Sequence, residues 1–116
     1  MLIIKNTKKY GRGVFTQSDI KANTLIDIAP LIVIKDKTEI KHILNGLLGS
    51  YVYAYGPKDE YVAIAGGVGS FFNHSEDNNV YWKFNTKKQQ IQYYSNQDIK
   101  AGQQLFLNYG YNILRK

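Results

Sequence analysis

Residues 70–79 read Ser-Phe-Phe-Asn-His-Ser-Glu-Asp-Asn-Asn, and residues 105–111 read Leu-Phe-Leu-Asn-Tyr-Gly-Tyr. The first stretch sets Asn73 and His74 directly behind two aromatic residues, and the second sets Tyr109 at the end of an apolar strand. Because an asparagine side chain offers both donors and an acceptor, this pairing suits recognition of a polar small molecule or a buried crossing of two segments. Packing alone explains neither stretch well.

The size and composition predict one globular domain spanning residues 1–116, with 44% hydrophobic and 21% charged residues. The chain has no cysteine, which excludes disulfides and a cysteine-based zinc cluster. It has only two histidines, so we expect no metal site. The apolar run at the N-terminus is too short for a signal peptide or a membrane span, and we expect a soluble, intracellular protein without a membrane partner.

The net charge of +6 includes two basic clusters, one from Lys5 to Arg12 and one from Lys83 to Lys88. Such clusters attract nucleic acid or an acidic surface, and they also occur as ordinary solvated surface. Direct nucleic-acid binding therefore stays open. The ten tyrosines suit strands and narrow slots with one wet end.

Strands dominate the expected secondary structure, so the predicted fold class is mostly β. The segment Thr24–Ile34 is β-branched and interrupted by Pro30, which predicts two strands or one bent edge strand. The other expected strands are Leu2–Lys5, Val14–Phe15, Asn79–Asn85, Gln90–Tyr94 and Gln104–Asn108, with a hairpin turn at residues 85–88.

One main helix is expected between Thr38, a residue type that caps helices, and Tyr51. Apolar residues recur at helical spacing on one face of this segment. Gly46 and Gly49 weaken the helix by roughly 1 kcal/mol each relative to alanine.

A short internal echo relates Asp19-Ile20-Lys21-Ala22-Asn23 to Asp98-Ile99-Lys100-Ala101-Gly102. Asn23 and Gly102 tolerate positive φ, so we expect two similar turns, each feeding a strand. Three glycines in residues 66–69 indicate close approach of the backbone to another segment or to a ligand.

The Gly11-Arg12-Gly13 turn lacks the further residues of a dinucleotide or phosphate loop. It is either a tight turn between strands or the backbone lining of a small-molecule pocket. His74 has no neighbouring triad partners, and a lone histidine is more often structural than catalytic.

Taken in order, these segments resemble the SET domain, the protein-lysine methyltransferase fold. Tyr10 to Phe15 resembles the family's first glycine motif, Ser70 to Asn79 its Phe-Asn-His-Ser-x-x-Pro-Asn signature, and Ile99 to Tyr109 its closing motif. Asn78 stands in place of the signature proline, and Gln103-Gln104 in place of the usual glutamate pair. In size the chain resembles small stand-alone viral and bacterial SET proteins.

The resemblance implies a β-clip-like fold of several small sheets, in which the Asn-His-Ser segment and the C-terminal strand form a pseudoknot. It implies S-adenosylmethionine as methyl donor and a lysine-containing protein or peptide, such as a histone tail, as substrate. A homodimer is a further family expectation. The implied residues are Gly11, Arg12, Gly13, Asn73 and His74 for the donor, Tyr109 and Tyr51 for catalysis, and Tyr53 and Tyr111 for the substrate channel.

The chemistry agrees with this resemblance. The attacking lysine amine must be neutral, whereas free lysine has a pKa of about 10.4. Burial in a tyrosine-lined channel and a nearby sulfonium both lower that pKa. Two alternatives stay open: a SET-like binding module with weak catalysis, and a small basic β-domain that binds nucleic acid.

Overall fold

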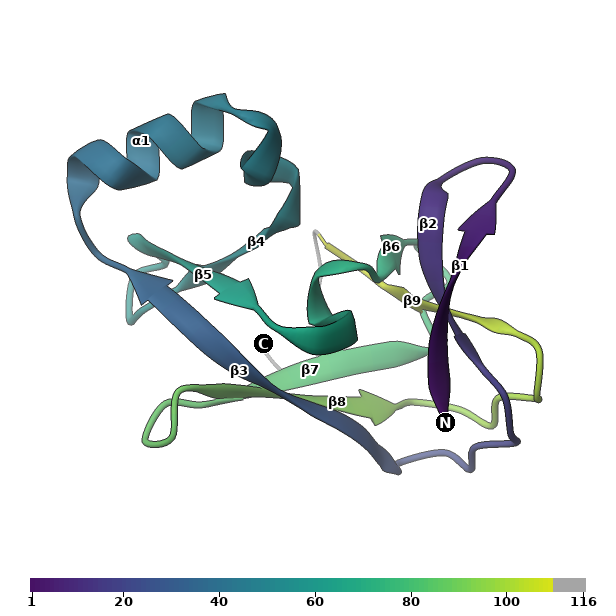
Figure 1. The fold of residues 1–116 in the computed structure, drawn as a ribbon. Helices are drawn as coiled ribbons and strands as arrows, with labels where there is room; N and C mark the ends of the chain where they lie inside the picture. Colours follow the sequence, from purple (N-terminus) through teal and green to yellow (C-terminus); the bar gives the residue numbers. More distant parts are fainter. Residues whose placement is uncertain (110–116) are drawn as a thin grey trace.

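Two β-sheets form the framework of the protein in the computed structural model, which describes residues 1–109 (Figure 1). The smaller sheet has the order β1-β2-β9-β6 and consists of Leu2–Thr7, Gly11–Thr16, Gln104–Leu107 and Asn73–His74. The larger sheet has the order β4-β5-β3-β8-β7 and consists of Val52–Tyr55, Tyr61–Ala65, Leu25–Ile34, Gln90–Ser95 and Val80–Asn85. The predicted mostly-β class is confirmed.

The long strand β3 is continuous and central, so the expectation of two strands or an edge strand is wrong. Its first half, through Pro30, pairs with β8, and its second half, from Leu31, pairs with β5. Proline lacks the N–H that a ladder needs, and it lies at the residue where β3 changes partner. Its carbonyl still accepts a hydrogen bond from the Gly66 amide at 3.0 Å.

The helix begins earlier and ends earlier than the sequence predicts. Helix α1 spans Lys37–Asn45, and Asp36 caps it by accepting the Glu39 amide at 3.0 Å, so Thr38 is not the cap. Gly46 is extended (φ −109°, ψ −175°) and ends α1, and a 3₁₀ helix, η1 (Leu47–Tyr51), follows. The glycine therefore breaks the predicted helix, and no α1 residue is buried.

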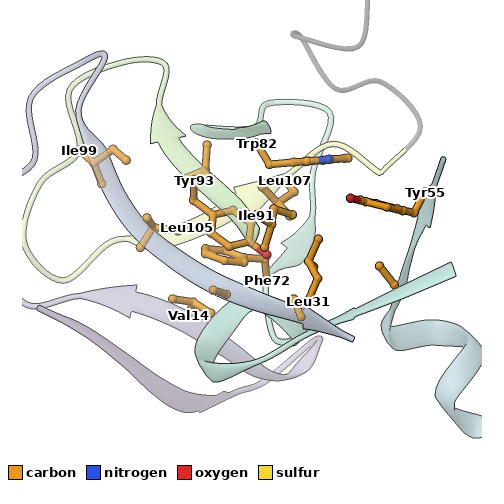
Figure 2. Packing of buried hydrophobic residues seen from close by; sticks show 14 residues of the cluster. Val14, Leu31, Tyr55, Phe72, Trp82, Ile91, Tyr93, Ile99, Leu105 and Leu107 are labelled. Atoms are coloured by element: carbon orange, nitrogen blue, oxygen red, sulfur yellow. The ribbon is translucent and has the colours of Figure 1, made fainter. Parts of the chain in front are cut away.

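The hydrophobic core lies where the two sheets face each other (Figure 2). Val14 and Leu105 from the smaller sheet and Ile91 and Tyr93 from the larger one are all fully buried. Strand β7 follows its predicted alternation, with Trp82 buried inward and its neighbour Lys83 exposed.

The two echoing turns exist and hold each other. Asp98 Oδ1 accepts the Ala22 amide at 2.9 Å, and Asp19 Oδ1 accepts the Ala101 amide at 2.8 Å. Between them, Ile20 forms an antiparallel bridge to the matching isoleucine of the other turn. This reciprocal clasp joins two chain segments about 80 residues apart in sequence, and both turns end in the positive φ expected (62° at residue 23, 92° at residue 102).

The Asn-His-Ser segment and the C-terminal strand lie together, as expected for the crossing. Strand β6 pairs in parallel with β9, and the Ser75 amide extends this pairing to the Leu107 carbonyl at 2.9 Å. The buried Asn79 then bonds β9 through both side-chain atoms: Oδ1 accepts the Phe106 amide at 2.8 Å, and Nδ2 donates to the Gln104 carbonyl at 3.0 Å.

Another 3₁₀ turn, η2 (Gly67–Ser70), leads into β6 through the glycine-rich segment. A methyl group on Gly69 would lie 2.6 Å from the Ala65 Cβ and 2.7 Å from the Tyr93 hydroxyl. Close approach therefore occurs at Gly69, and the neighbouring atoms belong to side chains of Ala65 and Tyr93. Within residues 1–109, no helix is long and apolar enough to cross a membrane.

Candidate active site

Two cavities share part of their lining. The first is called the donor-side cavity because it holds residues predicted to bind the methyl donor; it has about 510 Å³, lies against the β1–β2 hairpin and is lined by Asn6, Tyr10, Gly11, Arg12, Phe71 and Asn73. The second is called the acceptor-side cavity because it holds Tyr53, predicted for the substrate channel; it has about 390 Å³, lies against η1 and β4 and is lined by Gly49, Val52, Tyr53, Ala54, Gly69 and Trp82. Both are lined by the same shared wall, which consists of Ser50, Tyr51, Ser70, Phe72 and Tyr109.

The glycine turn supplies one side of the donor-side cavity through its backbone. Gly11 has φ +76°, a conformation that side chains rarely adopt. Its neighbour Arg12 places its guanidinium 4.7 Å from the centre of the Phe71 ring. This contact leaves a cation at the edge of a cavity that also has aromatic walls.

Asn73 joins the glycine turn to the last strand. Its Nδ2 donates to the Arg12 carbonyl at 3.0 Å and to Gln104 Oε1 at 2.8 Å. A methyl group on Gly13 would lie 2.8 Å from Asn73 Nδ2 and closer still to Gln104 Oε1, so it would displace these two amide ends. The amide of Gln104 thus supplies the acceptor at a position where the resemblance leads one to expect a carboxylate.

Tyr109 is held at both ends. Its hydroxyl donates to the Phe72 carbonyl, and its backbone amide donates to His74 Nδ1 at 2.9 Å. The bond to Nδ1 requires an unprotonated nitrogen there, so a neutral His74 ring carries its proton on Nε2. Burial of the hydroxyl, with a smaller contribution from Tyr51, raises the pKa of Tyr109. The hydroxyl is therefore a stable hydrogen-bond donor at neutral pH.

The acceptor-side cavity has a tyrosine pair beside it. The Tyr53 hydroxyl donates to the Gly69 carbonyl at 2.7 Å and lies 2.8 Å from the Tyr93 hydroxyl. Burial raises the pKa of both tyrosines well above the ordinary value of 10.0. Trp82 packs edge-on against Tyr53, with ring centres 5.4 Å apart, so the aromatic lining is fixed by packing.

The structure brings most of the predicted site residues to one place. Gly11, Arg12 and Asn73 line the donor-side cavity, Tyr53 lines the acceptor-side cavity, and Tyr51 and Tyr109 form part of the wall between them.

Two predicted residues lie just behind this lining. Gly13 packs against Asn73, and His74 accepts a hydrogen bond from the backbone amide of Tyr109 without lining either cavity. Tyr111 lies outside the described residues. The roles assigned to all these residues stay predictions.

Sequence reasoning missed several members of this arrangement, among them Ser50 of the shared wall. Ser70 and Phe72 lie in the quoted signature stretch, but no pattern showed that both reach the shared wall. Tyr93 could have been found, since alternation along Gln90–Tyr94 places it on one face with the fully buried Ile91. Within residues 1–109, no group of His, Cys, Asp and Glu side chains gathers in a way that could hold a metal ion.

Two cavities thus meet at one set of side chains, which includes Tyr109. The sequence pattern of the SET domain matches residues 11–110, which is most of the chain. The chain belongs to the SET domain family.

Relatives and solved structures agree with this assignment. A Schizosaccharomyces pombe protein named histone-lysine N-methyltransferase, H3 lysine-37 specific, is 35% identical over 109 residues, which cover 94% of this chain and 73% of that protein. A Plasmodium falciparum structure carrying the provisional name of histone methyltransferase superposes with a TM-score of 0.76 at 25% identity and covers 97% of this chain and 99% of that one.

A chain of polycomb repressive complex 2 has the same fold, with a TM-score of 0.75 at 22% identity over 96% of this chain and 15% of that one. The predicted SET fold is confirmed. The predicted enzyme class, a protein-lysine methyltransferase, agrees with the family and with the name of the Schizosaccharomyces pombe relative. The likeness to small viral and bacterial members stays a prediction.

Proposed function

We propose that this protein transfers a methyl group from S-adenosylmethionine to a lysine of a histone tail, with donor and acceptor entering from opposite cavities. The observation that carries the proposal is the shared wall, because it places Tyr109 within reach of both cavities. Bringing two reactants together in line is the main task of a catalyst for displacement at a methyl carbon.

The donor-side cavity fits the chemistry of S-adenosylmethionine. Its volume of about 510 Å³ lies in the usual range for small-molecule sites. Arg12 offers a cation for the carboxylate of the donor, backbone groups of Gly11 offer polar contacts, and Phe71 offers an aromatic face. When bound, S-adenosylmethionine would supply a methyl group on a positively charged sulfur.

The acceptor-side cavity suits a lysine side chain. Its lining of Tyr51, Tyr53 and Trp82 excludes water from the aliphatic stem and disfavours the charged ammonium. Once the amine has lost its proton to solvent, its lone pair is free to attack. The Phe72 carbonyl and the Tyr109 hydroxyl, already bonded to each other, provide polar atoms beside the reacting centre that orient this amine.

A histone tail is the proposed substrate class because the Schizosaccharomyces pombe relative is named for histone H3 lysine 37. A basic tail needs a local acidic contact on a protein with net charge +6. Glu76 and Asp77, in the turn after β6, are candidates for that contact. Homodimer formation stays a prediction.

The test starts with calorimetric titration of the protein with S-adenosylmethionine. Saturable binding to one site is expected, and Asn73→Ala should weaken it at least tenfold, because two hydrogen bonds of about 1 kcal/mol each hold the cavity wall. Asn85→Ala, in the hairpin turn of the larger sheet, is the matched control and should bind normally. An unchanged dissociation constant for Asn73→Ala would remove this residue from the donor site.

Transfer is then measured with labelled donor on histone H3 peptides. Label should enter an H3 peptide, and it should not enter the same peptide with its lysines replaced by arginine. Donor binding without transfer to any H3 peptide or whole histone would contradict the histone assignment while leaving the donor site intact.

A further inference from the structure

The β1–β2 hairpin is a strongly basic part of the protein. Residues 1–18 hold four of the chain's 15 basic residues and none of its 9 acidic residues. Lys5, Lys8 and Lys9 are all exposed on this hairpin or at its tip. The next acidic residue in sequence, Asp19, lies beyond β2 and accepts the Ala101 amide of the opposite turn.

Aromatic side chains accompany the lysines. Lys5 Nζ lies 4.4 Å from the centre of the Phe15 ring, and Lys9 Nζ lies 5.4 Å from that of Tyr10. Tyr10 is 41% exposed and packs edge-on against Phe106. These contacts hold two lysine cations against aromatic rings on a solvent-facing hairpin. Lysines that were only solvated would not need such fixed ring contacts.

The hairpin is also free to meet a partner. Strand β1 is the edge of the smaller sheet, and Figure 1 shows that the two-stranded ribbon projects from the rest of the molecule. Lys5 and Phe15 lie on one face of the ribbon, and Asn6 and Arg12, which line the donor-side cavity, lie on the other. Lys5 therefore lies on the face away from the cavity, whereas Lys9 lies beside Tyr10, which lines the cavity.

We infer that the β1–β2 hairpin binds the phosphate backbone of duplex DNA. Three exposed lysines in a stretch of 18 residues that holds no acidic residue suit a polyanion. A two-stranded ribbon fits the roughly 12 Å wide major groove of B-DNA, whereas the deep, narrow major groove of duplex RNA excludes it. Since Lys5, Lys8 and Lys9 would contact phosphates, the binding is independent of base sequence. This activity goes beyond methyl transfer and does not depend on it.

The test is fluorescence anisotropy with a short labelled DNA duplex, titrated with the whole protein at several salt concentrations. The dissociation constant should lie near 10⁻⁴ to 10⁻⁶ M at physiological salt, on the order expected for backbone binding. The triple variant Lys5→Gln, Lys8→Gln, Lys9→Gln should lose about two to three units of the slope of log K against log salt, roughly 0.9 for each phosphate contact. Its affinity near 0.1 M salt should fall at least about tenfold.

The other basic cluster provides a matched control. The variant Lys83→Gln, Lys87→Gln, Lys88→Gln removes the same charge from the β7–β8 hairpin and also removes a cation over a ring, at Tyr94. It should keep the slope within about one unit of the unaltered protein. Equal losses in both triple variants would overturn the inference, because overall charge and not the hairpin would then determine binding.

Two competitors complete the design. Unlabelled DNA duplex should displace the labelled duplex, while duplex RNA and polyglutamate at equal charge should do so at least about tenfold less well. Displacement by polyglutamate as effective as that by DNA would overturn the assignment in favour of an acidic protein surface. Unchanged thermal unfolding and unchanged S-adenosylmethionine affinity in the hairpin variant establish that a loss of DNA binding is not a loss of folding.

Discussion

Replacing Tyr109 by phenylalanine separates a catalytic hydroxyl from a structural one. The substitution keeps the ring, its 5.2 Å contact with His74 and the backbone bond to His74 Nδ1. It deletes only the hydroxyl that donates to the Phe72 carbonyl in the shared wall. Every change in the variant therefore traces to one O–H group.

The structure predicts different magnitudes for stability and for turnover. Tyr109 is 52% exposed and the substitution removes one hydrogen bond, so the loss of unfolding free energy should be about 1 kcal/mol. An oriented hydroxyl at the reacting centre is worth about 2.7–4 kcal/mol of barrier, which is roughly 10²–10³ in turnover. The variant should therefore fold normally and turn over slowly.

The assay is the single-turnover rate of methyl transfer at saturating donor, together with the thermal unfolding midpoint. Tyr81→Phe is the control, since Tyr81 stacks on Tyr94 at 5.5 Å and lines neither cavity. The control should keep its rate within a factor of about two. A Tyr109→Phe rate equally close to that of the unaltered protein would refute a catalytic role for this hydroxyl.

Three further predictions concern stability and donor binding. Burial raises the pKa of Tyr53 and Tyr93 above 10.0, so the unfolded chain loses these two protons at lower pH than the folded protein does. The free energy of unfolding should therefore fall by up to about 1.4 kcal/mol per pH unit for each tyrosine as the pH rises above 10. Denaturant titrations above pH 10 measure this slope, and a slope that Tyr93→Phe leaves unchanged contradicts the prediction. Gly13→Ala pushes apart the two amides packed against it and should weaken S-adenosylmethionine binding at least about tenfold by calorimetry, an expectation that normal binding would remove. Asp19→Ala and Asp98→Ala each delete one cap of the clasp and should each cost about 1 kcal/mol in urea denaturation, so a large difference between them would show that the two turns are not equivalent.

Much of the fold follows from local sequence patterns. Alternation along Asn79–Asn85 and the following turn predicted β7, its hairpin and its buried face, because side-chain direction in a strand repeats every two residues. The two ends of the helix were harder to predict. Apolar spacing continued across Gly46, but the backbone there is extended, and the capping carboxylate of Asp36 preceded the expected start.

The central position of β3 could not be predicted from local sequence patterns. A proline in a strand normally indicates an edge, because its missing N–H breaks a ladder. Pro30 avoids that cost by lying where β3 leaves β8 and joins β5. Such an exchange depends on how distant strands are placed, which the residues around Pro30 do not encode.

The candidate site was predicted in parts and assembled only by the fold. Motifs identified Asn73 and Tyr109, but the shared wall also needs Ser50 from the end of the helical segment and Ser70 from the glycine-rich turn. These small polar residues have no distinctive local pattern. What brings them together is the approach of three segments around Phe72, a tertiary property.

The clasp between the two echoing turns links this distant architecture to the site. The clasp fixes where the chain enters β9, since Asp19 accepts the Ala101 amide three residues before β9 begins at Gln104. From there β9 runs between β2 and β6, and its register places Leu107 beside His74. A slip of one residue would turn every β9 side chain to the opposite face and would separate the residues after β9 from the His74 ring. The five-residue echo in the sequence therefore helps to fix the register on which the position of Tyr109 depends.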